Sequence, residues 1–168
     1  MSLSSRAWSF RKLCLSGFIV CVALVAFALF SQFKWGLLPC PLCIFQRIAF
    51  AALALVLLVG GLHSPRKRGG RIGYGLLALV PALAGIAIAG RHVWLTHLPA
   101  DQVPSCGPPL EFMMEVNPLT DVIKQVLTGS GECAKVDWTF LGLSMPAWSL
   151  AWFLALLVLV LFAMTRRR

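Results

Sequence analysis

The stretch from residue 38 to residue 47 holds the side chains with the clearest capacity for chemistry. It reads Leu-Pro-Cys-Pro-Leu-Cys-Ile-Phe-Gln-Arg and places Cys40 and Cys43 at the start of an apolar run. If a helix begins near Pro41, Cys43 lies in its first turn, where free N–H groups and the helix dipole favour negative charge. Arg47, four residues on, shares that helical face. Both features stabilise a thiolate, so the pair is a candidate redox centre. A passive disulfide or half of a metal site are the alternatives.

The chain has four further cysteines. Cys14 and Cys21 lie inside the first apolar run, seven residues apart, and are expected to be small buried hydrophobes. Cys106 and Cys133 lie in the one long polar segment. Together with the first pair they can form two disulfides, and the spacing alone leaves all three connectivities open.

Metal binding is the main competitor to redox chemistry at these cysteines. A zinc site needs four thiolates or a Cys/His set at compact spacing, whereas Cys43 and Cys106 lie far apart in the chain. Attachment of haem c needs a histidine directly after the second cysteine, and Ile44 stands there. We therefore predict no metal.

His92 follows Arg91 near the outer end of the third apolar run, at about the depth of Arg47. An ionisable residue within a membrane span is a functional candidate by default. The alternative is that Arg91 extends to the membrane interface with His92 beside it. The sequence leaves both interpretations open.

Composition identifies the elements that must position these residues. Of the 168 residues, 59% are hydrophobic and 12% are charged, and the mean hydropathy is +0.84. Soluble domains are nearer half apolar and one quarter charged, so this is a membrane protein. The net charge of +9 comes from residues at the ends of apolar runs, which encodes membrane topology and argues against nucleic-acid binding.

The hydropathy pattern predicts an all-α integral membrane protein, a bundle of four transmembrane helices forming one membrane domain over residues 1–168. Glycines and alanines inside the third span suit close helix contacts in lipid. The predicted spans are 13–33, 44–62, 72–95 and 145–164.

Basic residues set the expected orientation. Ten of the 15 lie at the N-terminus, in the loop near residues 66–71 and at the C-terminus. The positive-inside rule then places both termini in the cytoplasm, and the short first loop and the long loop at about 96–143 outside. Cys40, Cys43, Cys106 and Cys133 would therefore all face a bacterial periplasm, where disulfides persist.

The long loop contains a predicted short helix. Asn117 and Pro118 form a start signal, and apolar residues then recur at helical spacing until Gly129. A short helix with one apolar face beside a bilayer is expected to lie on the membrane surface. The alternative is a packing helix for the loop, and the two interpretations are compatible.

Taken together, these motifs resemble the disulfide bond formation protein B (DsbB) family, quinone-dependent thiol oxidases of the bacterial inner membrane. The resemblance covers the four spans, the Cys-x-x-Cys-x-x-x-Arg motif ending at Arg47, and the loop with Cys106 and Cys133. It extends to Trp138 and to the segments Gly131-Glu132-Cys133-Ala134 and Phe140-Leu141-Gly142-Leu143-Ser144-Met145-Pro146-Ala147-Trp148.

The resemblance implies a relay. A reduced periplasmic partner of the thioredoxin fold, similar to DsbA, would attack a Cys106–Cys133 disulfide through Cys106. Cys133 would exchange with the first pair through Cys40, and Cys43 would donate electrons to ubiquinone or menaquinone. Arg47 would stabilise the Cys43 thiolate and contact the quinone.

The resemblance implies roles for two further positions around that relay. His92 occupies a position similar to a second quinone contact, and Trp138 is expected at the mouth of the quinone site. Gln46 stands where some relatives carry an acid, which alters the local charge.

Two other functions fit parts of the pattern. The vitamin K epoxide reductases also pair a Cys-x-x-Cys with a quinone in a four-helix bundle, but their loop pair precedes that motif, whereas here it follows. A non-catalytic scaffold braced by disulfides is the other alternative. It would show inert disulfides and no dependence on quinone.

Overall fold

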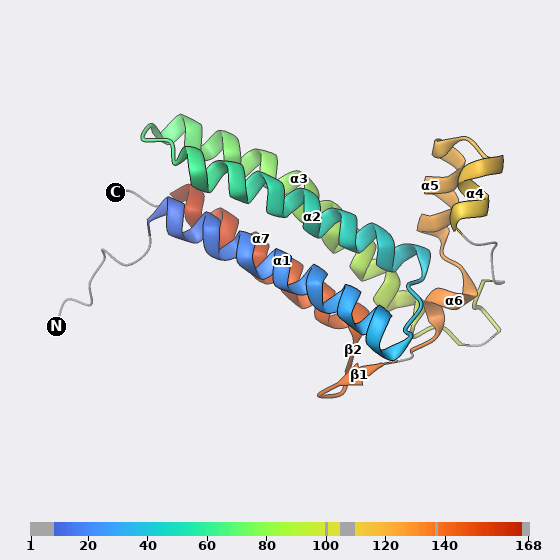
Figure 1. The fold of residues 1–168 in the computed structure, drawn as a ribbon. Helices are drawn as coiled ribbons and strands as arrows, with labels where there is room; N and C mark the ends of the chain where they lie inside the picture. The colour runs from blue at the N-terminus through green and yellow to red at the C-terminus, as the bar shows by residue number, and fades with distance from the viewer. Residues whose placement is uncertain (1–8, 100, 105–109, 137, 166–168) are drawn as a thin grey trace.

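The computed structural model describes residues 9–99, 101–104, 110–136 and 138–165. Cys106 and the terminal basic residues Arg6 and Arg166 to Arg168 lie outside the described residues. Four long helices lie side by side as a bundle (Figure 1). They are α1 (Phe10–Trp35), α2 (Pro41–His63), α3 (Arg68–Leu95) and α7 (Met145–Thr165). Each is long and apolar enough to cross a membrane, so the predicted all-α four-helix membrane bundle is confirmed.

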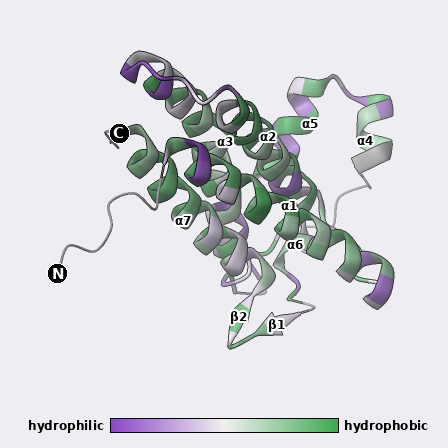
Figure 2. Cartoon of the chain, turned by 60° about the vertical axis from the view of Figure 1, so that its left-hand side comes forward, coloured by the Kyte–Doolittle hydropathy of each residue, from purple (hydrophilic) through white to green (hydrophobic). Residues whose placement is uncertain are grey.

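The helices begin up to four residues before the predicted apolar spans and end up to two residues after them. Ser9 caps α1, and its hydroxyl oxygen accepts a hydrogen bond from the Lys12 N–H at 3.4 Å. Hydrophobic residues cover the length of the helices and hydrophilic ones gather at the helix ends (Figure 2). Large apolar side chains such as Ile19, Val80 and Val158 are more than 60% exposed, as expected where the solvent is lipid.

The bundle core forms where α1 packs on α2, α2 on α3 and α3 on α7. Phe50 of α2 and Phe153 of α7 stack at its centre, with ring centroids 3.8 Å apart and planes 7° apart. Gly85 of α3 lies directly against the Phe153 ring, where a Cβ atom would overlap it. The predicted small-residue packing face of the third span is present in the buried residues Gly75, Ala82, Gly85 and Ala89.

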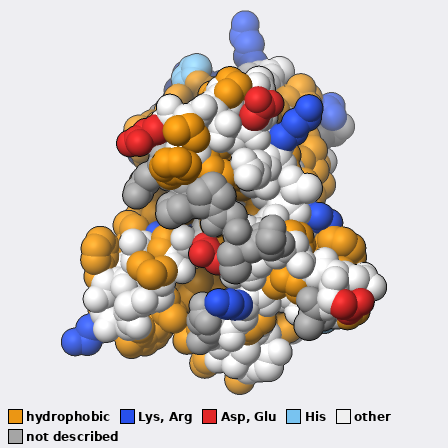
Figure 3. Space-filling model, turned by 90° about the vertical axis from the view of Figure 1, so that its right-hand side faces the viewer, with side chains coloured by type: hydrophobic (Ala, Val, Ile, Leu, Met, Phe, Trp, Pro, Cys, Tyr) orange, Lys and Arg blue, Asp and Glu red, His pale blue; other side chains and the backbone are white. Residues whose placement is uncertain are grey.

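The short elements gather at one end of the bundle, away from the start of α1 and the end of α7 (Figure 1). They are α4 (Leu110–Val116), α5 (Leu119–Thr128), α6 (Gly131–Ala134) and an antiparallel hairpin of β1 (Thr139–Phe140) and β2 (Leu143–Ser144). Viewed from this end, charged side chains of both signs are scattered among hydrophobic ones (Figure 3). Cys40, Cys43 and Cys133 all belong to this end, since they lie at the start of α2 and in α6.

The predicted loop helix is present as α5. It ends before Gly129, whose φ of +88° lies in a region that favours glycine. Val122 and Val126 are buried, and they belong to one apolar cluster with Leu42 of α2 and Leu95 of α3. The packing interpretation of this helix is therefore confirmed, and its contact with the membrane surface stays a prediction.

Arg91 attaches α5 to the end of α3. Its Nε donates to the carbonyl oxygen of Leu127 at 3.2 Å, and its Nη2 donates to that of Thr128 at 2.9 Å. The guanidinium also lies over the Trp94 ring, 4.2 Å from its centroid. A cation at the last carbonyls of a helix complements its dipole, so Arg91 has a structural partner in the loop.

Candidate redox site

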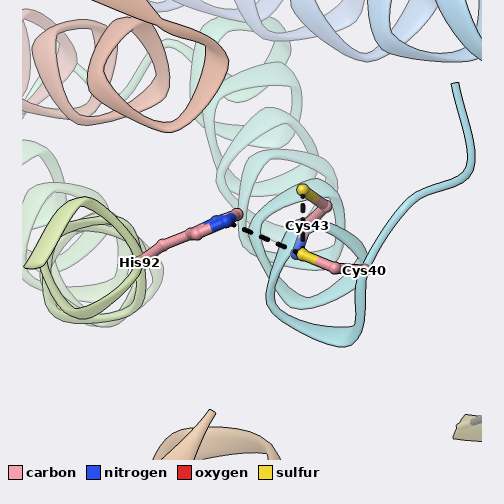
Figure 4. A group of neighbouring side chains, drawn as sticks. All are labelled: Cys40, Cys43 and His92. Carbon is pink, nitrogen blue, oxygen red and sulfur yellow. Dashed lines mark hydrogen bonds between the residues drawn. The ribbon is translucent and has the colours of Figure 1, made fainter. Parts of the chain in front are cut away.

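Cys43 lies in the first turn of α2, as the sequence predicted, and Cys40 directly precedes the helix. The helix begins at Pro41, a residue suited to a first helical position because its missing N–H would have no partner there. Cys40 is the N-cap, and its Sγ accepts the Cys43 N–H at 3.4 Å. The two sulfur atoms lie 3.3 Å apart (Figure 4). This capping interaction keeps the two sulfurs close together at the start of α2.

His92 reaches this pair from α3. Its Nε2 lies 3.7 Å from the Cys40 sulfur (Figure 4), and the side chain is only 2% exposed. Its Nδ1 lies 3.0 Å from Nε2 of Gln46, which is 4% exposed. The buried position favours the functional interpretation of His92 over a place at the membrane interface. Sequence reasoning missed the part of Gln46, although its spacing of three residues from Cys43 places both on one helical face.

Cys133 approaches the same pair from the loop. It lies in α6, is 1% exposed, and shares the apolar cluster of Cys40. Its sulfur lies 3.7 Å from the Ser130 hydroxyl oxygen. Two causes raise the pKa of the Cys133 thiol above its usual range. The larger is a hydrogen bond with Cys40 and the second is burial. The loop therefore holds one of its two cysteines in the same apolar cluster as Cys40.

A cavity of about 280 Å³ opens on the other side of the pair, between α1, α2, α7 and the hairpin. Its walls are mainly apolar and aromatic, and Cys43 and Arg47 contribute polar atoms to the lining. Two nitrogens of Arg47 are held by α1, since Nη1 donates to Gln32 Oε1 at 2.6 Å and Nη2 donates to the Ala28 carbonyl at 3.1 Å. Arg47 is thereby fixed beside the cavity.

The chemistry of this lining fits a quinone. A flat apolar ring with two carbonyl oxygens suits aromatic walls and a few fixed hydrogen-bond donors. Trp138 and Phe140 lie on the hairpin side, and the Trp148 indole N–H donates to the Phe140 carbonyl at 3.0 Å, which fastens the hairpin to α7. Trp138 thus lines the cavity, and its place at the mouth of a quinone site stays a prediction.

A smaller cavity of about 80 Å³ adjoins the first, because Cys43, Arg47 and Trp138 line both. His92 and Cys40 line only the smaller one. Of the sequence-predicted residues, Arg47 thus lines both cavities and His92 lines only the smaller one.

The structure brings together five of the six predicted site residues, and the sixth, Cys106, lies outside the described residues. Cys14 and Cys21 lie apart from the site, in the buried core of the bundle. The five that meet are Cys40, Cys43, Arg47, His92 and Cys133.

A bundle of membrane helices with clustered thiols at one end defines a class of integral membrane thiol–disulfide proteins. The family model described as disulfide bond formation protein DsbB matches residues 10–163. The chain therefore belongs to the DsbB family, whose members act in disulfide bond formation.

Individual relatives agree over nearly the whole chain. A disulfide bond formation protein B of Xanthomonas campestris pv. campestris (strain 8004) is 52% identical over 161 residues, which cover 96% of this chain and 94% of the relative. One from Xanthomonas euvesicatoria pv. vesicatoria is 53% identical over 156 residues, 93% of this chain and 91% of the relative. One from Xylella fastidiosa (strain Temecula1) is 49% identical over 157 residues, 94% and 91% of the two chains.

Proposed function

We propose that this protein is a quinone-coupled thiol oxidase that reoxidises a thioredoxin-fold disulfide donor similar to DsbA. One observation carries the proposal: the two sulfurs of the pair, 3.3 Å apart, have different neighbours. Cys40 shares an apolar cluster with Cys133 of the loop, and Cys43 lines the large apolar cavity. Electrons can therefore enter through one sulfur and leave through the other.

The thiol steps balance as exchanges. A thiolate of the reduced partner attacks Cys106 of a Cys106–Cys133 disulfide and releases Cys133, which attacks Cys40 of a Cys40–Cys43 disulfide and releases Cys43 as a thiolate. The second partner thiolate displaces Cys106, and the partner leaves with its own disulfide. Cys106 then attacks Cys133, which restores the loop disulfide and leaves Cys40 and Cys43 reduced.

The reduced pair must then lose two electrons and two protons. A bound quinone supplies the two-electron, two-proton acceptor that this step requires. Cys43 faces the cavity and is the sulfur proposed to deliver the electrons, and the Arg47 cation stabilises negative charge beside it. Arg47 is the proposed polar contact for a quinone in the large cavity, and His92 the second, from the adjoining small cavity.

The proposed location is the bacterial inner membrane, with the loop end in the periplasm. The distribution of basic residues supports this orientation. Disulfide donors of the thioredoxin fold work in that oxidising compartment. The protein would then join a soluble thiol partner to the membrane quinone pool.

The test uses the full chain in lipid nanodiscs with a reduced thioredoxin-fold partner and a short-chain ubiquinone or menaquinone. We expect catalytic oxidation of the partner dithiol only when quinone is present. Replacement of Cys40, Cys43, Cys106 or Cys133 by Ala should each abolish turnover, because each removes a sulfur of the relay.

Cys14→Ala and Cys21→Ala are the matched controls, since both residues are cysteines buried in the core away from the site. They should retain turnover. Activity that survives Cys106→Ala would refute the relay order. Oxidation that needs no quinone, or inert disulfides, would favour a scaffold.

A further inference from the structure

The reduced pair and His92 form a compact set of atoms that can act as metal ligands. Within the described residues, the two cysteine sulfurs and a ring nitrogen of His92 all lie within 4.8 Å of one another (Figure 4). We infer that, in the reduced protein, Cys40, Cys43 and His92 bind a divalent cation of the Zn²⁺ class.

The distances agree with a metal centre. Zinc bonds to sulfur at about 2.3 Å and to nitrogen at about 2.0–2.1 Å, so two ligands of a tetrahedral ion lie about 3.5–3.8 Å apart. The Cys40 and Cys43 sulfurs are separated by 3.3 Å, and Cys40 Sγ and His92 Nε2 by 3.7 Å. The third pair, the Cys43 sulfur and a His92 ring nitrogen, lies within 4.8 Å. Bringing all three atoms to bonding distance of one ion therefore takes an adjustment of about 1 Å at most.

Gln46 supplies the support that a ligating histidine usually has. Its side-chain amide meets His92 Nδ1 at 3.0 Å, and the oxygen and nitrogen of an amide are interchangeable by a flip. With the oxygen toward the ring, Nδ1 carries the proton and the Nε2 lone pair faces the sulfurs. Such partners orient the ring and raise its basicity as a ligand.

The surroundings leave a path and a fourth position. The 80 Å³ cavity is lined by all three ligands and by the exposed carboxylate of Glu132, which attracts a cation. The cations Arg47 and Lys135 line the same cavity and oppose that attraction, so the thiolates must supply most of the binding. Three protein ligands with one exchangeable position are typical of an open zinc site. Sequence spacing predicted no metal because His92 joins the pair only through the packing of α3 on α2.

Binding of the ion and formation of the disulfide exclude each other. The ion takes the place of the two thiol protons, which are released, and no electrons move. When Cys40 and Cys43 form a disulfide, neither sulfur is a thiolate and the set loses two of its three ligands. The site should therefore exist only in the reduced protein.

The experiment titrates Zn²⁺ into the full chain in nanodiscs, reduced with a phosphine that is then removed, against a chromophoric chelator. We expect one ion per reduced chain, and no binding of that affinity in a chain whose cysteines have been oxidised with a chemical oxidant such as diamide. Cd²⁺ in place of Zn²⁺ should give thiolate-to-metal absorption, and Zn²⁺ should protect Cys40 and Cys43 from alkylation. Equal binding by oxidised and reduced protein would overturn the inference.

Variants test the ligand set. His92→Ala should lower the affinity by at least about a hundredfold, and Gln46→Leu by about tenfold. His97→Ala is the matched control, an exposed histidine just beyond α3, and should bind as the unchanged chain does. If His92→Ala fails to fold, Gln46→Leu and the alkylation test on the unchanged chain decide. Unaltered affinity in both variants would mean adventitious binding to thiols.

These outcomes do not depend on the proposed oxidase function. The ion is measured by stoichiometry, absorption and protection of thiols, none of which needs turnover. A reduced chain that binds one ion but oxidises no partner would refute the proposed oxidase function and support the metal site. A chain that turns over but binds no ion would do the reverse.

Discussion

At the scale of single residues, the position of the positive charge beside the large cavity depends on Arg47 being an arginine. Its guanidinium uses two nitrogens on two acceptors of α1, the Gln32 side chain and the Ala28 carbonyl. A lysine carries one nitrogen on a flexible stem and cannot reproduce this fixed fork. The charge would remain, but its position beside the cavity would not.

Arg47→Lys should therefore raise the KM for quinone by about tenfold, the equivalent of one charged hydrogen bond, with a smaller effect on kcat. Steady-state kinetics with a short-chain quinone measure both constants. Lys34→Gln is the control, a cation in the last turn of α1 that does not line the cavity. A KM within twofold of the unchanged value would remove Arg47 from the quinone site.

The residue scale is also where sequence reasoning reached furthest and then stopped. The position of Cys43 and Arg47 on one face followed from the helix period, because both belong to α2. The meeting of Cys40 with His92 and Cys133 depends on α3 and α6, and no local pattern encodes which helices pack together. Gln46 was missed for the same reason, since its partner lies on α3.

At the scale of elements, α5 joins the loop to the bundle through two buried valines. Val122 is 1% exposed and Val126 is 3% exposed, whereas Leu119 is 67% exposed. The apolar spacing in this segment was sufficient to predict the helix. Only the structure distinguishes which apolar residues face Leu42 and Leu95. The elements that escaped prediction, α4, α6 and the hairpin, have two to seven residues each, too few for a periodic signal.

Val122→Ala should destabilise the docked loop by about 2 kcal/mol, because it removes two buried methyl groups and leaves a cavity. Hydrogen exchange of the α5 amides should accelerate accordingly. Leu119→Ala, a larger truncation at an exposed site of the same helix, should leave exchange nearly unchanged. Equal acceleration in both variants would contradict the packing described for α5.

At the scale of the whole molecule, the bundle depends on close approach of α3 and α7. Gly85 permits the Phe153 ring to lie against the backbone of α3 and to stack on Phe50. Hydropathy predicted the four helices and the small residues predicted a packing face, but neither identifies α7 as the neighbour of α3. That pairing depends on the fit of one ring to one gap.

Gly85→Ala should lower stability by about 1–3 kcal/mol, since the added methyl overlaps a ring held by its stack. Gly90→Ala is the matched control in the same helix, because nothing lies within 4 Å of its added Cβ. It should be neutral or slightly stabilising, by about 0.5–1 kcal/mol. Thermal unfolding in nanodiscs compares the two, and equal stability would contradict the packing of α3 on α7.

The orientation of the bundle is tested by labelling intact cells with an impermeant thiol reagent. In a background without the native site cysteines, Lys135→Cys should react from outside, and Arg66→Cys only after the inner membrane is opened. Both positions are exposed and lie at opposite ends of the bundle. The reverse pattern would place the redox site in the cytoplasm, where a periplasmic partner could not reach it.

The hydrogen bonds from Arg91 to the last carbonyls of α5 limit how far Cys133 can move from the end of α3. Five residue steps separate Thr128 from Cys133, and a fully extended chain of that length spans about 18 Å. While the Arg91 hydrogen bonds hold, Cys133 stays within this distance of Thr128, which is bound to the end of α3. A partner that attacks a Cys106–Cys133 disulfide must therefore dock close to this end of α3, or the Arg91 hydrogen bonds must first break.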